Sequence, residues 1–184
     1  LAGVFESSPY LTTLILRDPV LVERLLTAVP EHEHLQLISD LQLAMSDAAD
    51  MPGAKKALRV YKNALALLSA LADLGGVWPV MTVTRALSEC ADAAVSCAVR
   101  FLFARAAAGG KWQPPDPAAP EKDSGYFVLA MGKHGAFELN YSSDIDLIVF
   151  FDRDRSRLAG GGDLQSFLVR LTRDLVALIE ERTP

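Results

Sequence analysis

The sequence predicts an α+β fold in which a helical bundle is followed by a smaller part that contains strands. Apolar residues recur at helical spacing from residue 9 to about residue 108. A stretch with four prolines, residues 109–124, then breaks this pattern. Two short apolar runs, "YFVLAM" and "DIDLIVFF", follow and are typical of strands. We therefore expect a helical domain at 1–108, a proline-rich linker or loop at 109–124 and a second domain at 125–184.

The helical part contains several segments with a clear beginning or end. "DPVLVERLLTAV" begins with Asp18 as a cap and Pro19 in the first turn, where a missing N–H costs little. Residues 54–76 end in two glycines, a C-terminal signal, and residues 80–108 are rich in alanine, which lets neighbouring helices approach closely. The apolar stripes predicted for residues 34–45 and 54–76 are Leu35, Ile38, Leu41 and Met45, and Leu58, Tyr61, Leu65 and Leu68.

The second part begins after the proline-rich stretch, which has few apolar residues and therefore little to bury. The runs at 126–131 and 144–151 are predicted to be buried strands. A glycine-rich loop at 156–162 precedes Asp163, which is suited to cap a last helix. The apolar stripe of that helix is Leu164, Phe167, Leu168, Leu171, Leu175 and Leu178.

Composition excludes several classes of protein. A formal net charge of −5 and a pI near 5.2 argue against nucleic acid as a partner, because such proteins usually carry a basic domain or face. Cys90 and Cys97 lie one heptad apart in a helical segment, which indicates neither a disulfide nor a zinc cluster. We find no apolar stretch of membrane-spanning length and no signal peptide, so we expect a cytoplasmic protein. Because it starts at Leu1 rather than Met, we interpret the chain as a fragment.

The two aspartates Asp144 and Asp146 are the first candidates for chemistry. If they lie in a strand, their side chains project from the same face, because successive side chains alternate. Two adjacent carboxylates repel each other unless a cation neutralises them. Oxygen ligands of this kind suit Mg²⁺ or Mn²⁺, which take the rest of their shell from water and substrate phosphates.

The residues before the aspartates suggest a phosphate-binding turn. A strand that ends at Gly132 and turns through Lys133, Gly135 and Ala136 into a short helix would leave backbone N–H groups free for an anion. Lys133 is about equally well explained as a solvated turn residue. Ser142 and Ser143 either bind phosphate or hold the turn.

Three histidines and the other loop residues carry less weight. We expect His134 to be incidental, because no partner for an acid–base role is visible in the sequence. His32 and His34 are better explained by a helix start than by a metal site.

"LAMGKHGAFELNYSSDIDLIVFF" closely resembles the signature of the bacterial bifunctional glutamine synthetase adenylyltransferase/adenylyl-removing enzymes, a family in the polymerase-β-like nucleotidyltransferase superfamily. The usual form is Gly-Lys-Leu-Gly-Gly, two variable positions, Leu-Asn, an aromatic residue and Ser-Ser-Asp-Ile-Asp-Leu. "SPYLTTLILRDPVLVERLL" and "LLSALADLGGVWPVMTVTRALSECADAAV" resemble the family's upstream helical region. The resemblance covers nearly the whole chain. It implies a nucleotidyltransferase domain with a mixed sheet and helices, truncated at its C-terminus, after the helical bundle.

The resemblance also implies a reaction. The family carries two such domains, and Ser-Ser-Asp-Ile-Asp together with the opening helices matches the N-terminal, adenylyl-removing half. Its reaction is phosphorolysis, in which phosphate attacks the AMP on a tyrosine of adenylylated glutamine synthetase and ADP leaves. The resemblance assigns the metals to Asp144 and Asp146, and the phosphate or nucleotide to the turn residues. The PII nitrogen signal protein and glutamine are the family's usual regulators.

Two departures from the family pattern bear on this expectation. Ala136 replaces the second glycine, which is tolerable if that residue is helical but produces a clash if it needs positive φ. The superfamily's third metal-binding carboxylate lies on a later strand, and no matching segment occurs before Pro184. We therefore expect the chain by itself to show little or no deadenylylation.

Two other functions remain open at the level of sequence. One is a different polymerase-β-like nucleotidyltransferase, acting on a nucleic acid or an antibiotic. The other is a regulatory or scaffolding fragment whose nucleotidyltransferase-like part is inert. The acidic composition and the upstream match argue against the first, and the two intact aspartates argue against natural decay of the site.

Overall fold

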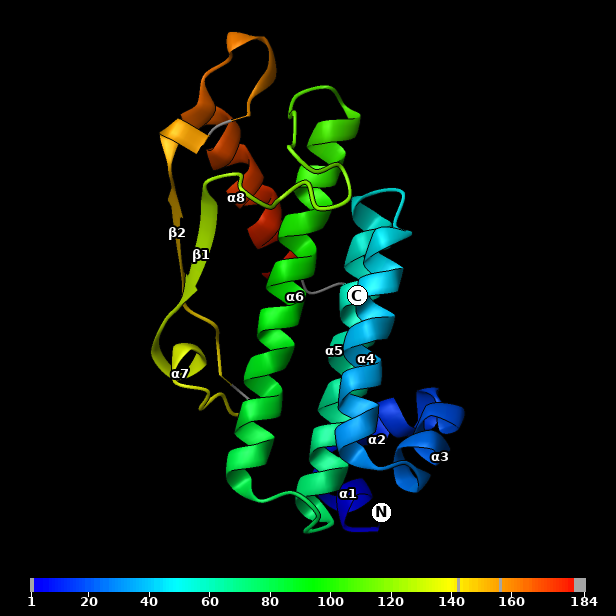
Figure 1. Cartoon of the computed structure of the whole chain (residues 1–184). Coiled ribbons are helices and arrows are strands. Elements are labelled where there is room, and N and C mark those ends of the chain that lie inside the picture. Colours follow the sequence, from blue (N-terminus) through cyan, green and yellow to red (C-terminus); the bar gives the residue numbers. More distant parts are fainter. Residues whose placement is uncertain (1, 142, 156, 181–184) are drawn as a thin grey trace.

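The computed structural model describes residues 2–141, 143–155 and 157–180. Three short helices, three long helices and a two-stranded hairpin are followed by a last helix (Figure 1). The elements are α1 (Ala2–Ser7), α2 (Pro9–Arg17), α3 (Pro19–Thr27), α4 (Pro30–Ser46), α5 (Met51–Leu74), α6 (Val80–Ala108), β1 (Tyr126–Ala130), α7 (Gly132–Gly135), β2 (Leu147–Phe151), the 3-10 turns η1 (Arg153–Arg155) and η2 (Ala159–Gly161), and α8 (Leu164–Glu180). The α+β prediction is confirmed.

Local capping signals set several of the helix starts. The Asp18 carboxylate accepts a hydrogen bond from the backbone N–H of Leu21, and Pro19 is the first residue of α3, as the sequence predicted. Asp50 caps α5 in the same way through Gly53. Asp163 accepts from the N–H groups of residues 165 and 166 at the start of α8, which confirms that cap as well. Short polar side chains therefore satisfy amides that the helices themselves leave free.

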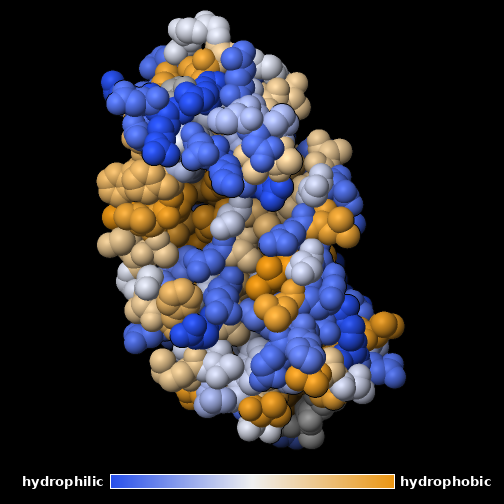
Figure 2. Space-filling model, viewed as in Figure 1, coloured by the Kyte–Doolittle hydropathy of each residue, from blue (hydrophilic) through white to orange (hydrophobic). Residues whose placement is uncertain are grey.

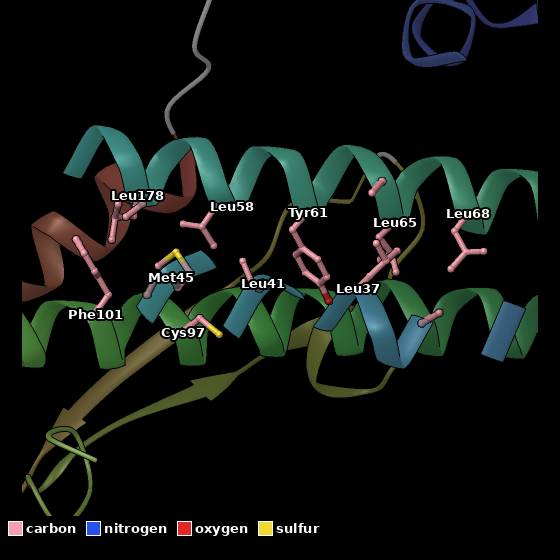
Figure 3. Packing of buried hydrophobic residues seen from close by; sticks show 14 of the residues in the cluster. Leu37, Leu41, Met45, Leu58, Tyr61, Leu65, Leu68, Cys97, Phe101 and Leu178 are labelled. Atoms are coloured by element: carbon pink, nitrogen blue, oxygen red, sulfur yellow. The ribbon is translucent and has the colours of Figure 1, made fainter. Parts of the chain in front are cut away.

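The hydrophobic core lies between α4, α5 and α6, the three long helices that run side by side in Figure 1. Figure 3 shows the α5 stripe of Leu58, Tyr61, Leu65 and Leu68 directed into this core, as predicted. On α4 the prediction was confirmed at Leu41 and Met45 but wrong at Leu35, which is 62% exposed. The buried residues of α4 are at positions 33, 34, 37, 41 and 45. The contact with α5 and α6 selects this face, because the apolar residues of α4 offer more than one stripe.

Helix α6 is packed along most of its length. It contacts α4 and α5 on one side and α8 on another, and its many alanines allow these close approaches. Its two cysteines are free thiols, and burial raises the pKa of Cys90 to about 12. Cys97 is buried in the bundle core. Among the helices that the structure describes, none combines the length and apolar character that crossing a membrane requires.

The two strands form an antiparallel hairpin with Tyr126 opposite Phe151 and Ala130 opposite Leu147. Only one face of the hairpin rests on the helices, so the prediction of fully buried strands was wrong. The other face is 42–49% exposed, and Figure 2 shows an apolar area over the strands. The residues of this face are Phe127, Leu129, Ile148 and Phe150. The resemblance implied a mixed sheet. Within the described residues the sheet consists of this antiparallel pair of strands.

The proline-rich stretch is more closely packed than the sequence indicated. Trp112 is only 2% exposed, and its indole N–H donates to the carbonyl of Pro120 at 3.0 Å. The indole ring stacks on Phe167 of α8 at a centroid distance of 5.8 Å and meets Phe103 of α6 edge-on. The expectation that this stretch has little to bury was therefore wrong. One tryptophan is enough to join the loop, α6 and α8 in the same core.

We expect Trp112→Ala to lower the free energy of unfolding by about 3–5 kcal/mol, because it leaves a cavity between the Phe103 and Phe167 rings and frees the Pro120 carbonyl. Urea denaturation followed by circular dichroism measures this change. Lys111→Ala, at the exposed neighbouring position, is the matched control and should stay within about 0.5 kcal/mol of wild type. Equal stabilities for the two variants would contradict a packed loop.

Candidate functional site

The candidate residues lie in the loop that joins the two strands, residues 131–146, which we call the connecting loop. The hairpin ladder extends one step into this loop, since the N–H of Met131 donates to the carbonyl of Asp146 at 2.9 Å. Strand β2 begins at Leu147, so Asp144 and Asp146 precede the strand and the prediction that they lie within it was wrong.

Asp146 lies next to the start of the predicted phosphate turn. Gly132 has a positive φ of 55°, and a Cβ built on it would stand 3.5 Å from Asp146 Oδ2. The Met131–Asp146 hydrogen bond holds the two backbones together at this point. Both Asp144 and Asp146 have exposed side chains. The structure therefore brings one of the two carboxylates against the glycine turn and leaves both accessible to solvent.

The turn itself depends on a close approach at Gly135. A Cβ at this position would lie 2.5 Å from the carbonyl oxygen of Ala130, closer than real side chains come to backbone. Ala136, by contrast, has φ −86° and ψ −3°, a right-handed helical conformation that any residue adopts. The alanine that replaces the family's second glycine is therefore compatible with the turn, and the backbone needs no positive φ there.

Free donors are present on the turn. The backbone N–H groups of Gly132, Lys133 and His134 have no acceptor among the described residues, because they open the single helical turn α7. The Lys133 side chain is exposed and forms no ion pair within the described part of the chain. Phosphate binding by these three N–H groups and by the Lys133 side chain stays a prediction.

The serines of the motif differ in what the structure shows. Ser142 lies outside the described residues. The Ser143 hydroxyl donates to Asn140 Oδ1 at 2.9 Å and accepts from the N–H of Asn140 at 3.2 Å. Its single proton is thus engaged in holding the turn, one of the two roles that the sequence left open. Phosphate binding by Ser143 stays a prediction and would require this bond to break.

Asp144 and Asp146 are the residues of the connecting loop that could hold a divalent metal. Within residues 2–141, 143–155 and 157–180, no group of three or more His, Cys, Asp or Glu side chains is arranged to hold a metal ion. Asp144 and Asp146 supply two exposed carboxylates with oxygen donors only, which fits Mg²⁺ or Mn²⁺ if water and phosphate complete the shell. His34 of the "EHEH" motif is paired with Glu89 of α6, at 2.9 Å.

Sequence reasoning missed how the connecting loop is fastened to the helices. His134 is 2% exposed, and its Nε2 lies 2.9 Å from Asp92 Oδ1 on α6. Further contacts join Leu139 to Ser88, Phe137 to Arg85 and Tyr141 to Asp73. Partial burial, with the neighbouring Asp73 carboxylate, raises the pKa of Tyr141. The histidine itself was noticed in the sequence, but no local signal identified a partner 42 residues away.

Comparisons with known proteins bear on the whole chain. Residues 1–184 match the model of the family described as glutamate-ammonia ligase adenylyltransferase. The chain belongs to this family. A bifunctional glutamine synthetase adenylyltransferase/adenylyl-removing enzyme from Bradyrhizobium diazoefficiens is 48% identical over 183 residues, which are 100% of this chain and 18% of the relative. Enzymes of the same description from Bradyrhizobium sp. and Xanthobacter autotrophicus are 49% and 43% identical, over 19% and 18% of their lengths.

The adenylyltransferase family is therefore shown, as the resemblance implied, and the chain spans about a fifth of the length of these relatives. The curated names state two activities, adenylyl transfer and adenylyl removal, for the whole relatives.

We expect Gly135→Ala to lower the free energy of unfolding by about 1–3 kcal/mol, because its methyl group would overlap the Ala130 carbonyl and force the turn to shift. Thermal or urea denaturation measures the loss. Ala136→Gly, the neighbouring change in the opposite direction, is the control and should cost only about 0.5–1 kcal/mol, since position 136 already has helical geometry. A Gly135→Ala variant no less stable than Ala136→Gly would show that the close approach is unimportant.

Proposed function

We propose that this chain is the catalytic-core segment of an adenylyl-removing domain, which deadenylylates glutamine synthetase by phosphorolysis. One observation carries the proposal. The Asp146 carboxylate lies against Gly132, at the start of a turn with free backbone donors and the exposed Lys133. Membership of the adenylyltransferase family supports the nucleotidyl-transfer chemistry.

The proposed reaction exchanges one phosphorus–oxygen bond for another. An oxygen of inorganic phosphate attacks the phosphorus of the AMP group, the bond from phosphorus to the tyrosine oxygen breaks, and ADP leaves. The tyrosine oxygen takes up a proton, so no oxidant or reductant is needed. In this scheme the amides of residues 132–134 and Lys133 bind phosphate oxygens, because an anion is stabilised by donors with no other acceptor.

Asp144 and Asp146 would hold Mg²⁺ or Mn²⁺. Bound there, the ion would supply positive charge that offsets the negative charge of two phosphate groups brought together. Both carboxylates are exposed in the described structure and are therefore open to solvent and phosphate, and Asp146 lies beside the turn. The remaining expectations, regulation by the PII protein and by glutamine and a cytoplasmic location, stay predictions that rest on the resemblance.

We expect Mn²⁺ to bind the 184-residue chain more tightly in the presence of phosphate, and to bind both Asp144→Asn and Asp146→Asn at least about tenfold more weakly than wild type. Electron paramagnetic resonance of free Mn²⁺ measures the affinity. Glu138→Gln removes an exposed carboxylate from the same loop and is the control for a general loss of negative charge. If Glu138→Gln weakens binding as much as the two aspartate variants, a specific site at the aspartates is ruled out.

Activity is best tested in the context of a longer relative. We expect a chimera in which residues 1–184 replace the matching segment of the Bradyrhizobium diazoefficiens enzyme to release ADP from adenylylated glutamine synthetase, Mg²⁺ and phosphate. Asp144→Asn should reduce this release by at least about a hundredfold, because the metal loses a ligand. The Asp144→Asn chimera should still transfer AMP from ATP to unmodified glutamine synthetase. If Asp144→Asn instead abolishes this transfer and leaves ADP release intact, the segment belongs to the adenylyl-transferring activity.

A further inference from the structure

A cavity lies beside the connecting loop. Between α6 and the strands the structure leaves a cavity of about 470 Å³, which Figure 2 shows as a hollow beside the strands. Its lining includes Val95 and Val99 of α6, Val128 and Leu147 of the strands, and the Asp92–His134 pair. Because this space separates the strands from α6, continuous packing does not hold the loop end of the hairpin on the helix. Individual contacts must do so.

The shortest of these contacts joins His134 to Asp92. His134 is 2% exposed, whereas the Asp92 side chain is 50% exposed, and the two atoms are 2.9 Å apart. A carboxylate only accepts hydrogen bonds, so His134 Nε2 must donate. The other ring nitrogen, Nδ1, is buried and has no partner within the described residues. A single hydrogen bond to α6 thus sets the orientation of a buried ring in the middle of the site turn.

We propose that Asp92 and His134 form a latch, in which Asp92 acts as a positioning residue that holds the site turn on α6. His134 lies one residue after Lys133 and two after Gly132, the glycine against which the Asp146 carboxylate lies. Fixing the imidazole ring therefore fixes the free amides of the turn relative to that carboxylate. The role of the latch in phosphate and metal binding rests on the proposed function. Its role as a restraint on the loop does not, and is tested separately.

The chain contains a matched control for this pair. His34 of α4 is also buried, its Nε2 lies 2.9 Å from Glu89 Oε2, and its Nδ1 likewise has no described partner. Glu89 and Asp92 are three residues apart on α6. Both pairs join a buried histidine to a carboxylate on α6. The His34–Glu89 pair fastens α4 to α6, whereas the His134–Asp92 pair fastens the connecting loop to α6. Substitutions in the His34 pair therefore report the general cost of breaking such a bond.

Amide hydrogen exchange in the 184-residue chain tests the restraint. The N–H groups of residues 135, 136, 138 and 139 are hydrogen-bonded within the loop or to Ser88, so their exchange reports loop opening. We expect these amides to exchange about tenfold faster in His134→Leu and in Asp92→Ala, and Asp92→Asn, which keeps the acceptor oxygen, to retain most of the protection. His34→Leu and Glu89→Ala should accelerate exchange in α4 and leave the loop unchanged.

Mn²⁺ binding tests the purpose of the latch. With Mn²⁺ and inorganic phosphate as the probes, we expect His134→Leu and Asp92→Ala to bind the metal about tenfold more weakly, with Asp92→Asn restoring most of the affinity and the His34 and Glu89 variants matching wild type. A role limited to stability would move the denaturation midpoint but not this affinity.

The outcomes separate the latch from the proposed function. Two results for His134→Leu would overturn the latch as a local restraint. One is amide exchange in the loop within about twofold of the wild-type rate, and the other is an acceleration of exchange in α5 and α8 as large as that in the loop. Faster loop exchange with unchanged Mn²⁺ affinity would overturn its role in positioning the site. A wild-type chain that binds no Mn²⁺ at Asp144 and Asp146 would overturn the proposed function, while the exchange measurement would still decide whether the latch exists.

Discussion

The burial of α6 between two sets of helices is the constraint on which the rest of the structure depends. One side of α6 packs on α4 and α5, and another side carries α8. Near the C-terminal end of α6, Phe103 is fully buried against Trp112 of the following loop and Tyr126 of β1. These ring contacts fix the loop and the start of β1 relative to α6. The hydrogen bonds that join the connecting loop to α6 lie towards the other end of this helix, at Ser88 and Asp92.

This arrangement explains how a hairpin of only two strands supports a candidate site. An isolated hairpin is marginally stable in water, and here one face is partly buried against the helices while the other remains exposed. Tyr126 at one end of β1 is buried, and its hydroxyl is 3.0 Å from that of Thr172 on α8. The opposite end leads into the connecting loop. Side-chain contacts at both ends thus hold the register that places Asp146 beside Gly132.

Sequence reasoning was most successful where the cause is local. Helix caps at Asp18 and Asp163 and the α5 stripe follow from neighbouring residues or from a short motif. It failed where the cause is a partner distant in sequence. Leu35 belongs to a plausible helical stripe, but packing against α5 and α6 buries Leu37 instead. Trp112 lies in a proline-rich stretch that looks solvent-exposed until Phe103 and Phe167 surround it.

The sequence by itself determined the family, the order of helices and strands, and the two aspartates with the glycine turn that precedes them. These features depend on residue types at fixed spacing, which a linear chain displays directly. The tertiary structure alone decided that Asp144 and Asp146 precede the strand, that one hairpin face is exposed, and that His134 is bonded to Asp92. Each of these depends on which surfaces meet after folding, because burial and hydrogen bonding between residues far apart in the chain have no local signature.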